Sequence, residues 1–372
     1  MMRRTMQSML LAVLLLFLWT APVYGENELL EEMDFTEVDQ MLDETFEEDI
    51  SFGQMVKDLI SGKVPLNRES LLHIVESTFL SEIKANGKGM IYIFLLAVLS
   101  AVLTNFTRVF ERSQTADISF YVVYLLLLAV LVQSFKTINS VSEMVVGQMT
   151  DFMKLLMPTY MLTVAASKGG TTAAVFYEFL IALIYGVNFI LYRFLMPLCN
   201  VYVVLSLVNY IAKEDMLSKT ADLIKTLVRW GLKTMLAVVV GLNIVQGLIT
   251  PAVDTFKTTA IHKAVTAVPG IGSTMNAVTE VVVGSGMLIK NGVGTGILIL
   301  LILLCMVPVM KMAVFILLYK AAAAVVQPVS EKRMIDCINT VSEGAHLLLK
   351  CVTTALVLFF ITIAILTVST SL

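Results

Sequence analysis

Long apolar runs, separated by short polar segments, dominate the chain from residue 89 to the C-terminus. A run of about 18 or more apolar residues can cross the roughly 30 Å hydrocarbon core of a bilayer as a helix. The pattern predicts spans at Ile91–Phe110, Ile118–Ser134, Thr172–Tyr192, Met235–Ile249 with its flanks, and Cys351–Val368. Helices satisfy their own backbone hydrogen bonds in lipid, so the predicted fold is all-α, a polytopic helical membrane protein. With the shorter apolar segments included, we expect about 8–10 transmembrane helices.

Two parts of the membrane region share one order of segments. Pro158 and Pro197 bracket an apolar segment, and Pro269 and Pro308 bracket another at the same offset. A second apolar segment, a charged amphipathic segment and a last apolar helix follow in both cases. Polytopic transport proteins are often built by such duplication. We therefore expect a transmembrane hairpin at 89–140 and two parallel membrane repeats, at 141–250 and 251–372. The alternative is that alternating spans and loops echo one another by chance.

The N-terminus has the pattern of a secretory signal peptide. Residues 1–25 contain Arg3 and Arg4, an apolar core at Met9–Trp19, and a plausible processing site ending at Gly25. The alternative is an uncleaved first helix. In both cases the following segment is translocated across the membrane.

An acidic extracytoplasmic leader with amphipathic helices is predicted at residues 26–88. No Lys or Arg lies between Arg4 and Lys57, and the acidic residues concentrate in Glu26–Asp49. This segment is either a solvated spacer or a helix that docks on a partner. The spacing of apolar residues in Phe52–Lys84 predicts two amphipathic helices broken at Gly62–Asn67. A head of about 60 residues is too small for an independent enzyme core.

Composition supports the membrane assignment. Hydrophobic residues make up 58% of the chain and charged residues 15%, whereas a soluble domain has about 25% charged residues. The net charge of −3 combines the acidic leader with a basic membrane region. Cytoplasmic loops are rich in Lys and Arg. We therefore expect Glu26 outside and the following on the cytoplasmic side: Arg108, Arg112, Lys213–Lys233, Lys332, Arg333 and Lys350.

This orientation requires each repeat to cross the membrane an even number of times. The short segments Leu155–Ser167 and Ile271–Ile289 must then cross, or a neighbour must not, and re-entrant half-helices are the alternative. The amphipathic segment Lys213–Lys233 has cations on one side and apolar residues on the other. It is predicted to be an interfacial helix on an anionic leaflet, with membrane lipids as partners.

The chain contains no catalytic motif that we recognise. It has no nucleotide-binding P-loop, its three histidines are far apart in sequence, and its four cysteines have no C-x-x-C spacing. We expect no enzymatic activity, no cofactor, no metal site and no nucleic-acid partner. The cysteines are predicted to be buried thiols.

Charged residues in or beside the apolar spans are candidate pathway residues. A Lys or Arg at the centre of a membrane helix costs roughly 2.5–3.5 kcal/mol on insertion scales, so it snorkels or faces a polar interior. The candidates are Glu178, Arg193, Lys290 and Lys320. Glu178 and Arg193 are about 22 Å apart along one helix and cannot pair, whereas Glu178 with Lys290 or Lys320 is a candidate interhelical pair. Lys311 is expected to snorkel.

Glycine and proline mark candidate positions for helix packing or helix breaks. Gly292 and Gly296 have the small-xxx-small spacing that lets two helices approach closely. The alternative is a broken helix lining a pathway, as in transporters. The same two readings apply to Pro158, Pro197, Pro269 and Pro308.

The whole organisation resembles the stage III sporulation protein AE family of endospore-forming Firmicutes. The resemblance covers essentially the full chain and includes the stretches Leu156-Met157-Pro158-Thr159-Tyr160 and Val268-Pro269-Gly270-Ile271-Gly272. It implies a multi-pass protein of the mother-cell membrane around the forespore. It also implies partners, namely other proteins of the same sporulation operon and a forespore-side envelope protein. Together these would form a secretion-like trans-envelope channel complex required during endospore formation, in which this chain is permease-like without an established substrate.

Two classes of function therefore compete. The acidic leader favours a structural or gate-forming subunit of a channel complex, because a lone carrier needs no such segment. The duplicated spans and intramembrane charges favour an autonomous transporter of a small molecule or ion. A third alternative, the permease half of an ATP-driven transporter, requires a separate nucleotide-binding protein on a cytoplasmic segment.

Overall fold

The computed structural model describes residues 35–45, 51–61, 68–109, 113–168, 170–211, 215–266, 272–328 and 330–369. Every regular element in these residues is a helix, which confirms the all-α prediction. The elements are α3 (Thr36–Thr45), α4 (Phe52–Ile60), α5 (Arg68–Val109), α6 (Ser113–Lys168), α7 (Gly170–Ile190), the π-helical turn η1 (Leu191–Leu195), α8 (Met196–Asn209), α9 (Ser218–Thr266), α10 (Gly272–Val326) and α11 (Lys332–Ser369). The predicted signal peptide and Pro269 lie outside the described residues.

Within the described residues, five helical stretches are long and apolar enough to cross a membrane. They are Tyr121–Ala165, Ala173–Asn209, Ser218–Val245, Ile289–Val326 and Lys332–Thr367. Several segments that were predicted as separate spans are joined here into one helix. The 56 residues of α6 combine the predicted span Ile118–Ser134 with the amphipathic segment after it and the short segment around Pro158. The 55 residues of α10 likewise absorb most of Ile271–Ile289.

The prolines do not end the membrane helices. Pro158 lies inside α6 and Pro308 inside α10. A proline lacks one N–H donor, but a membrane helix tolerates this loss when the neighbouring structure satisfies the freed carbonyl. Pro197 lies in the first turn of α8, directly after η1. There the N–H of Met196 bonds to the carbonyl of Leu191, five residues earlier, so the chain passes from α7 into α8 through a π-bulge without a loop.

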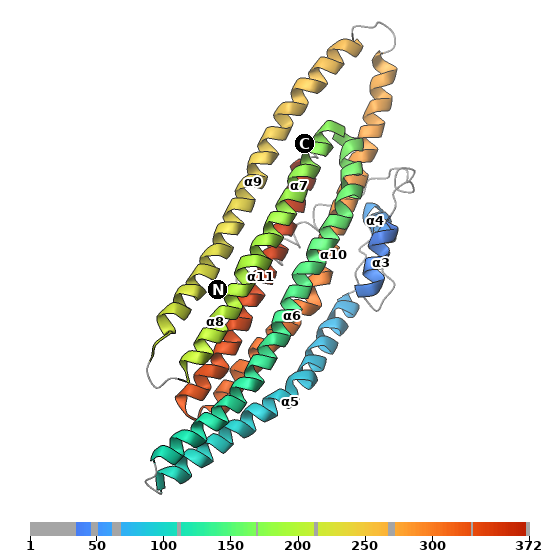
Figure 1. Ribbon diagram of the computed structural model, residues 1–372. Helices are drawn as coiled ribbons and strands as arrows, with labels where there is room; N and C mark the ends of the chain where they lie inside the picture. Colours follow the sequence, from blue (N-terminus) through green and yellow to red (C-terminus); the bar gives the residue numbers. More distant parts are fainter. Residues whose placement is uncertain are drawn as a thin grey trace.

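From α5 to α11 the helices form an elongated bundle in which the chain reverses direction at each connection, with α7, η1 and α8 forming one continuous segment (Figure 1). The connections between α5 and α6, between α8 and α9, and between α10 and α11 lie at the same end, which we call the basic end. Arg108 is in the last turn of α5, Lys219 in the first turn of α9, and Lys332 begins α11. Between the first and second of these connections, and again between the second and third, the chain runs to the other end of the bundle and back. The two repeats and the orientation stay predictions.

A pair of helices projects from the opposite end of the bundle. At about 1.5 Å per residue, the 49 residues of α9 and the 55 of α10 extend over roughly 73 and 82 Å. A bilayer core is only about 30 Å thick. Figure 1 shows α9 and α10 continuing past their neighbours at the end away from the basic connections. We call residues 246–266 of α9 and 272–288 of α10 the helical arm.

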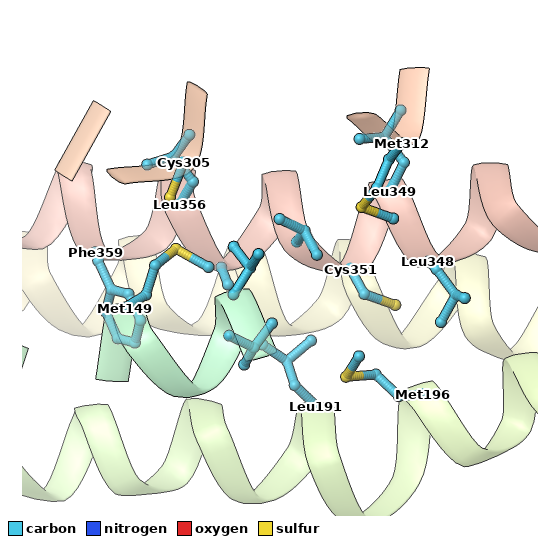
Figure 2. Packing of buried hydrophobic residues seen from close by; sticks show 14 of the residues in the cluster. Met149, Leu191, Met196, Cys305, Met312, Leu348, Leu349, Cys351, Leu356 and Phe359 are labelled. Atoms are coloured by element: carbon cyan, nitrogen blue, oxygen red, sulfur yellow. The ribbon is translucent and has the colours of Figure 1, made fainter. Parts of the chain in front are cut away.

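The core between α6, η1, α8, α10 and α11 is filled by methionine, leucine, cysteine and aromatic side chains. Figure 2 shows Met149, Leu191, Met196, Met312, Leu349 and Phe359 interdigitating, and all of them are buried. Because lipid tails are as apolar as leucine, such helices associate through van der Waals packing and interhelical hydrogen bonds. All four cysteines are buried and unbridged, as predicted.

Interhelical hydrogen bonds supplement this packing. Tyr124 donates to the carbonyl oxygen of Leu207 over 2.6 Å, and the hydroxyls of Tyr160 and Thr367 lie 2.9 Å apart. In double-mutant cycles on bacteriorhodopsin such bonds average about 0.6 kcal/mol each. They therefore select the register of the helices rather than supply most of the stability.

Candidate functional site: a docked leader and a charged cavity

The two leader helices fold onto the chain's own membrane bundle. α3 packs on α6 and α4 packs on α10 (Figure 1). The apolar faces are buried: Val38 and Leu42 from α3 with Phe35 directly before it, and Phe52, Met55 and Val56 from α4. The rings of Phe35 and Phe52 meet edge to face, with centroids 5.1 Å apart. The helices α3 and α4 are therefore packed on the bundle of their own chain and are not a solvated spacer, while docking of the leader on a partner stays a prediction.

Gly292 and Gly296 form the seat for α4. A Cβ atom added at Gly292 would lie 2.6 Å from Cγ1 of Ile60, and one at Gly296 would lie 3.0 Å from Cε2 of Phe52. Both glycines are buried, and α10 is continuous through them, so the structure contains no helix break at these positions. Their small-xxx-small spacing allows the amphipathic α4 to approach α10 closely. The sequence alone did not identify α4 as the partner of these glycines.

Asp39 connects the two leader helices. Its Oδ1 accepts a hydrogen bond from the N–H of Phe52 and its Oδ2 one from the hydroxyl of Ser51, at 2.6 and 3.3 Å. Ser51 is the N-cap of α4 and accepts from the N–H of Gln54. A carboxylate at a helix N-terminus satisfies free N–H groups and interacts favourably with the helix dipole. From the sequence, Asp39 was considered only as part of the acidic charge of the leader. The signal that could have predicted this cap was Ser51, a serine directly before the apolar residues of α4.

A charged cavity of about 640 Å³ lies at the basic end, between α8, α9, α10 and α11. Its lining contains both signs of charge together with hydroxyl and amide groups. The lining residues are Tyr202, Ser206, Asn209, Tyr210, Asp215, Ser218, Ala221, Asp222, Lys225, Lys320, Arg333, Asp336, Asn339, Thr340 and Glu343. Such a cavity suits a polar or charged ligand more than an apolar one.

Glu343 contacts side chains from two other helices at the wall of this cavity. Its Oε2 accepts a 2.8 Å hydrogen bond from the hydroxyl of Tyr202 and forms an ion pair with the ammonium group of Lys225. That ammonium group also lies 5.4 Å from the centroid of the Tyr202 ring. The side chain of Lys225 is only 18% exposed and that of Glu343 47% exposed. Because the three residues belong to α8, α9 and α11, the cluster joins three helices at the cavity wall.

The turn from α8 to α9 is held by side chains of the same cavity. The amide oxygen of Asn209 accepts from the N–H groups of Met216 and Leu217, and its nitrogen donates to Asp215. The hydroxyl of Ser218 donates to Asp215 over 2.6 Å. The hydrogen bonds from Ser218 and then Asn209 hold the pKa of the Asp215 carboxyl below its usual value. Asp215 thus caps the start of α9 in its ionised form.

The other charged candidates from the sequence are dispersed. Lys320 lines the cavity, whereas Lys290 is fully buried and lies earlier in α10, away from the cavity. Glu178 is exposed on α7, which packs on α6 and α9, while α10 packs on α11, α6, α5 and α4. Among the described residues Glu178 forms no ion pair, so the structure does not bring it to Lys290 or Lys320. Arg193 is exposed in η1.

Lys311 pairs with Glu82 of α5 at 3.8 Å, and its expected extension towards the membrane surface stays a prediction. One further expectation is corrected. The segment Lys213–Lys233 is not a separate interfacial helix, because α9 begins at Ser218 and continues to Thr266. Its apolar face is buried through Ala221, Ile224, Val228 and Leu232, and α9 packs on α8 and α11.

Comparison with known proteins gives one consistent result. A family model described as stage III sporulation protein AE matches residues 50–370. The chain is 24% identical over 310 residues to the stage III sporulation protein AE of Bacillus subtilis (strain 168), covering 83% of this chain and 77% of that protein. No solved structure matches. The match includes α4 and its seat as well as the cavity.

Proposed function

The chain belongs to the stage III sporulation protein AE family, and on that premise we propose that it is a multi-pass subunit of a mother-cell-to-forespore trans-envelope channel complex. It acts during endospore formation in the mother-cell membrane around the forespore. Its role is permease-like and gate-forming rather than catalytic, without cofactor. Its partners are the other proteins of the same sporulation operon and a forespore-side envelope protein.

The helical arm is the observation that carries this proposal. It projects from the end of the bundle opposite the basic end (Figure 1). With the basic connections in the cytoplasm and the leader translocated, that end faces the space between the two membranes. A carrier of small molecules has no need of helices that extend far beyond the bilayer. A subunit that meets a protein from the facing membrane does need such a reach.

The docked leader supports the same function. α3 and α4 are held on α6 and α10, which continue towards the end with the arm. The leader and the arm thus form one preorganised extracytoplasmic surface, and preorganisation lowers the entropic cost of assembly.

The autonomous transporter remains the second candidate because of the charged cavity. Its volume of about 640 Å³ is within the range of roughly 300–1,000 Å³ typical of small-molecule sites. Beyond the cavity, however, the described core between α6, α8, α10 and α11 is filled by apolar side chains such as Met149, Met196 and Met312 (Figure 2). This packed core favours a subunit whose conduit is completed by assembly.

Shortening the arm tests the proposal. Deleting residues 253–263 and 275–285 removes about three turns from each helix and preserves the helical phase, at 3.6 residues per turn. We expect normal membrane levels, loss of partner proteins from affinity purifications of sporulating cells, and loss of spores. Unchanged partner recovery and unchanged sporulation would refute the role of the arm. Recovery of an ATPase in place of envelope proteins would favour the permease half of an ATP-driven transporter.

A further inference from the structure

A second charged feature lies beside the cavity, along the contact between α9 and α11. Lys225, Arg229 and Lys233 are spaced by four residues, so they occupy successive turns on one side of α9, about 6 Å apart along its axis. On α11, His346 and Lys350 continue the line that begins at Glu343. Because α9 packs on α11 and Lys225 pairs with Glu343, the two lines of side chains face each other. We call Arg229, Lys233, Lys320 and Lys350 the cationic cluster, and His346 lies among them.

The members of the cluster lie within electrostatic range of one another. The charges of Arg229, Lys225 and Lys233 act on Lys350. Those of Lys350, Lys320 and Arg229 act on His346. The carboxylate of Glu343 acts on both groups, and it is already paired with Lys225.

The cluster has an excess of positive charge that the described protein does not neutralise. Arg229, Lys233, Lys320 and Lys350 form no ion pair with a described carboxylate. Arg229, Lys233 and Lys320 are exposed, and His346 and Lys350 are half-buried. Bringing like charges together at the edge of a membrane is unfavourable unless an anion joins them. The cationic cluster therefore favours binding of a ligand with concentrated negative charge.

The surface next to the cluster has the character of a lipid-tail site. Towards the middle of the bundle, the same side of α11 continues with the partly exposed Val357, Phe360 and Ile361. On α9, the partly exposed Leu236 and Val240 follow Lys233. The feature is thus charged near the basic end and apolar towards the membrane centre. This order matches a phospholipid, whose phosphate lies at the interface and whose acyl chains extend inwards.

We propose that the cationic cluster binds the phosphate headgroup of an anionic phospholipid from the leaflet at the basic end. The guanidinium of Arg229 supplies a planar fork suited to phosphate oxygens, and the lysines add point charges. Basic pockets between membrane helices on the cytoplasmic side recognise such headgroups. The lipid bridges α9 and α11, and so stabilises the wall of the cavity. This inference does not depend on the channel-subunit proposal.

The test uses the purified full chain. Its thermal unfolding is measured in nanodiscs of phosphatidylcholine alone and in nanodiscs containing phosphatidylglycerol, and native mass spectrometry counts retained phospholipids. The variant is Arg229→Gln with Lys350→Gln. The control is Lys136→Gln with Arg193→Gln, which removes the same charge from exposed positions outside the cluster. Arg229→Lys, which keeps the charge, is the milder variant.

We expect phosphatidylglycerol to raise the unfolding temperature of the wild type and of the control, and the double variant to lose most of this shift together with its retained lipid. Arg229→Lys should keep part of both. Equal shifts in the double variant and the control would overturn the site. So would an equal shift produced in phosphatidylcholine nanodiscs by inorganic phosphate, because the ligand would then be a soluble anion. If the double variant fails to fold, Arg229→Lys is the test: a smaller unfolding shift and fewer retained phospholipids than in the wild type support the site, and unchanged values contradict it.

Discussion

The carboxylate of Asp39 accepts a 2.6 Å hydrogen bond from the backbone N–H of Phe52. Asp39 belongs to α3, which packs on α6, and Phe52 begins α4, which packs on α10. One carboxylate therefore couples the two contacts that hold the leader on the membrane bundle.

Removing this carboxylate should loosen the leader without unfolding the bundle. Replacing a capping side chain by alanine costs about 1 kcal/mol, so Asp39→Ala should accelerate hydrogen exchange in residues 51–61 several-fold. Asp39→Asn keeps an acceptor and should have a smaller effect. Asp58→Ala is the matched control, because it removes a carboxylate from α4 that accepts only from Gln54 within the described residues. Exchange as slow as in the wild type would show that the cap does not hold α4.

The seat of α4 should not tolerate a larger side chain. Gly292→Ala places Cβ 2.6 Å from Cγ1 of Ile60, and overpacking of this kind costs about 1–3 kcal/mol. We expect a lower membrane level and an α4 that is more accessible to protease. The second substitution Ile60→Ala should restore much of the loss because it removes the clashing atoms. Gly186→Ala should be neutral, because no atom lies within 4 Å of the added Cβ. A similar loss in Gly186→Ala would show that the effect comes from replacing any helix glycine and not from the contact with α4.

The Lys225–Glu343 pair should show measurable coupling in a double-mutant cycle. Lys225 is mostly buried, whereas Glu343 is half-exposed and screened by solvent, so we expect about 1 kcal/mol. Chemical unfolding in detergent of Lys225→Ala, Glu343→Ala and the double variant gives this energy. The exposed pair of Asp151 and Lys154, spaced by three residues, is the control and should couple by less than about 0.5 kcal/mol. Equal coupling in both pairs would contradict a special role for the cavity pair.

The start of α9 should depend on pH through Asp215. The pKa of its carboxyl is lowered in the folded state, so its contribution is complete above the unfolded pKa of about 3.9. It is lost as the pH falls through the lower folded value. Hydrogen exchange at residues 216–218, measured relative to Asp215→Asn, should therefore accelerate only below about pH 4. A transition near neutral pH would assign the dependence to another group.

The orientation of the bundle predicts which cysteines an impermeant thiol reagent reaches. Gln40 and Lys219 are exposed, and the four native cysteines are buried and should stay silent. Gln40→Cys should react from outside intact cells, and Lys219→Cys only after permeabilisation. Labelling of position 219 in intact cells would reverse the orientation and place the basic end outside.

Some features were predictable because their causes are local. The run lengths of apolar residues determine that the chain is a helical membrane protein, since each helix satisfies its own backbone in lipid. The Lys and Arg of the connections predicted their common side, and Arg108, Lys219 and Lys332 do lie towards one end. The glycine spacing indicated close packing, but it did not identify α4 as the partner.

Other features depend on contacts between distant parts of the chain. Whether Pro158 ends a helix or lies within α6 depends on the neighbours that satisfy the freed backbone group. The pairing of Lys225 with Glu343, and the separation of Glu178 from Lys290, follow from which helices are adjacent.

By itself, then, the sequence determined the all-helical membrane class, the common side of the basic connections and the family, because run length, charge and local motifs are readable along the chain. Tertiary structure decided how many segments join into one helix, where α4 docks and which charges meet. These outcomes are set by packing between α6, α8, α9, α10 and α11, and one-dimensional spacing carries no information about which helical faces come together.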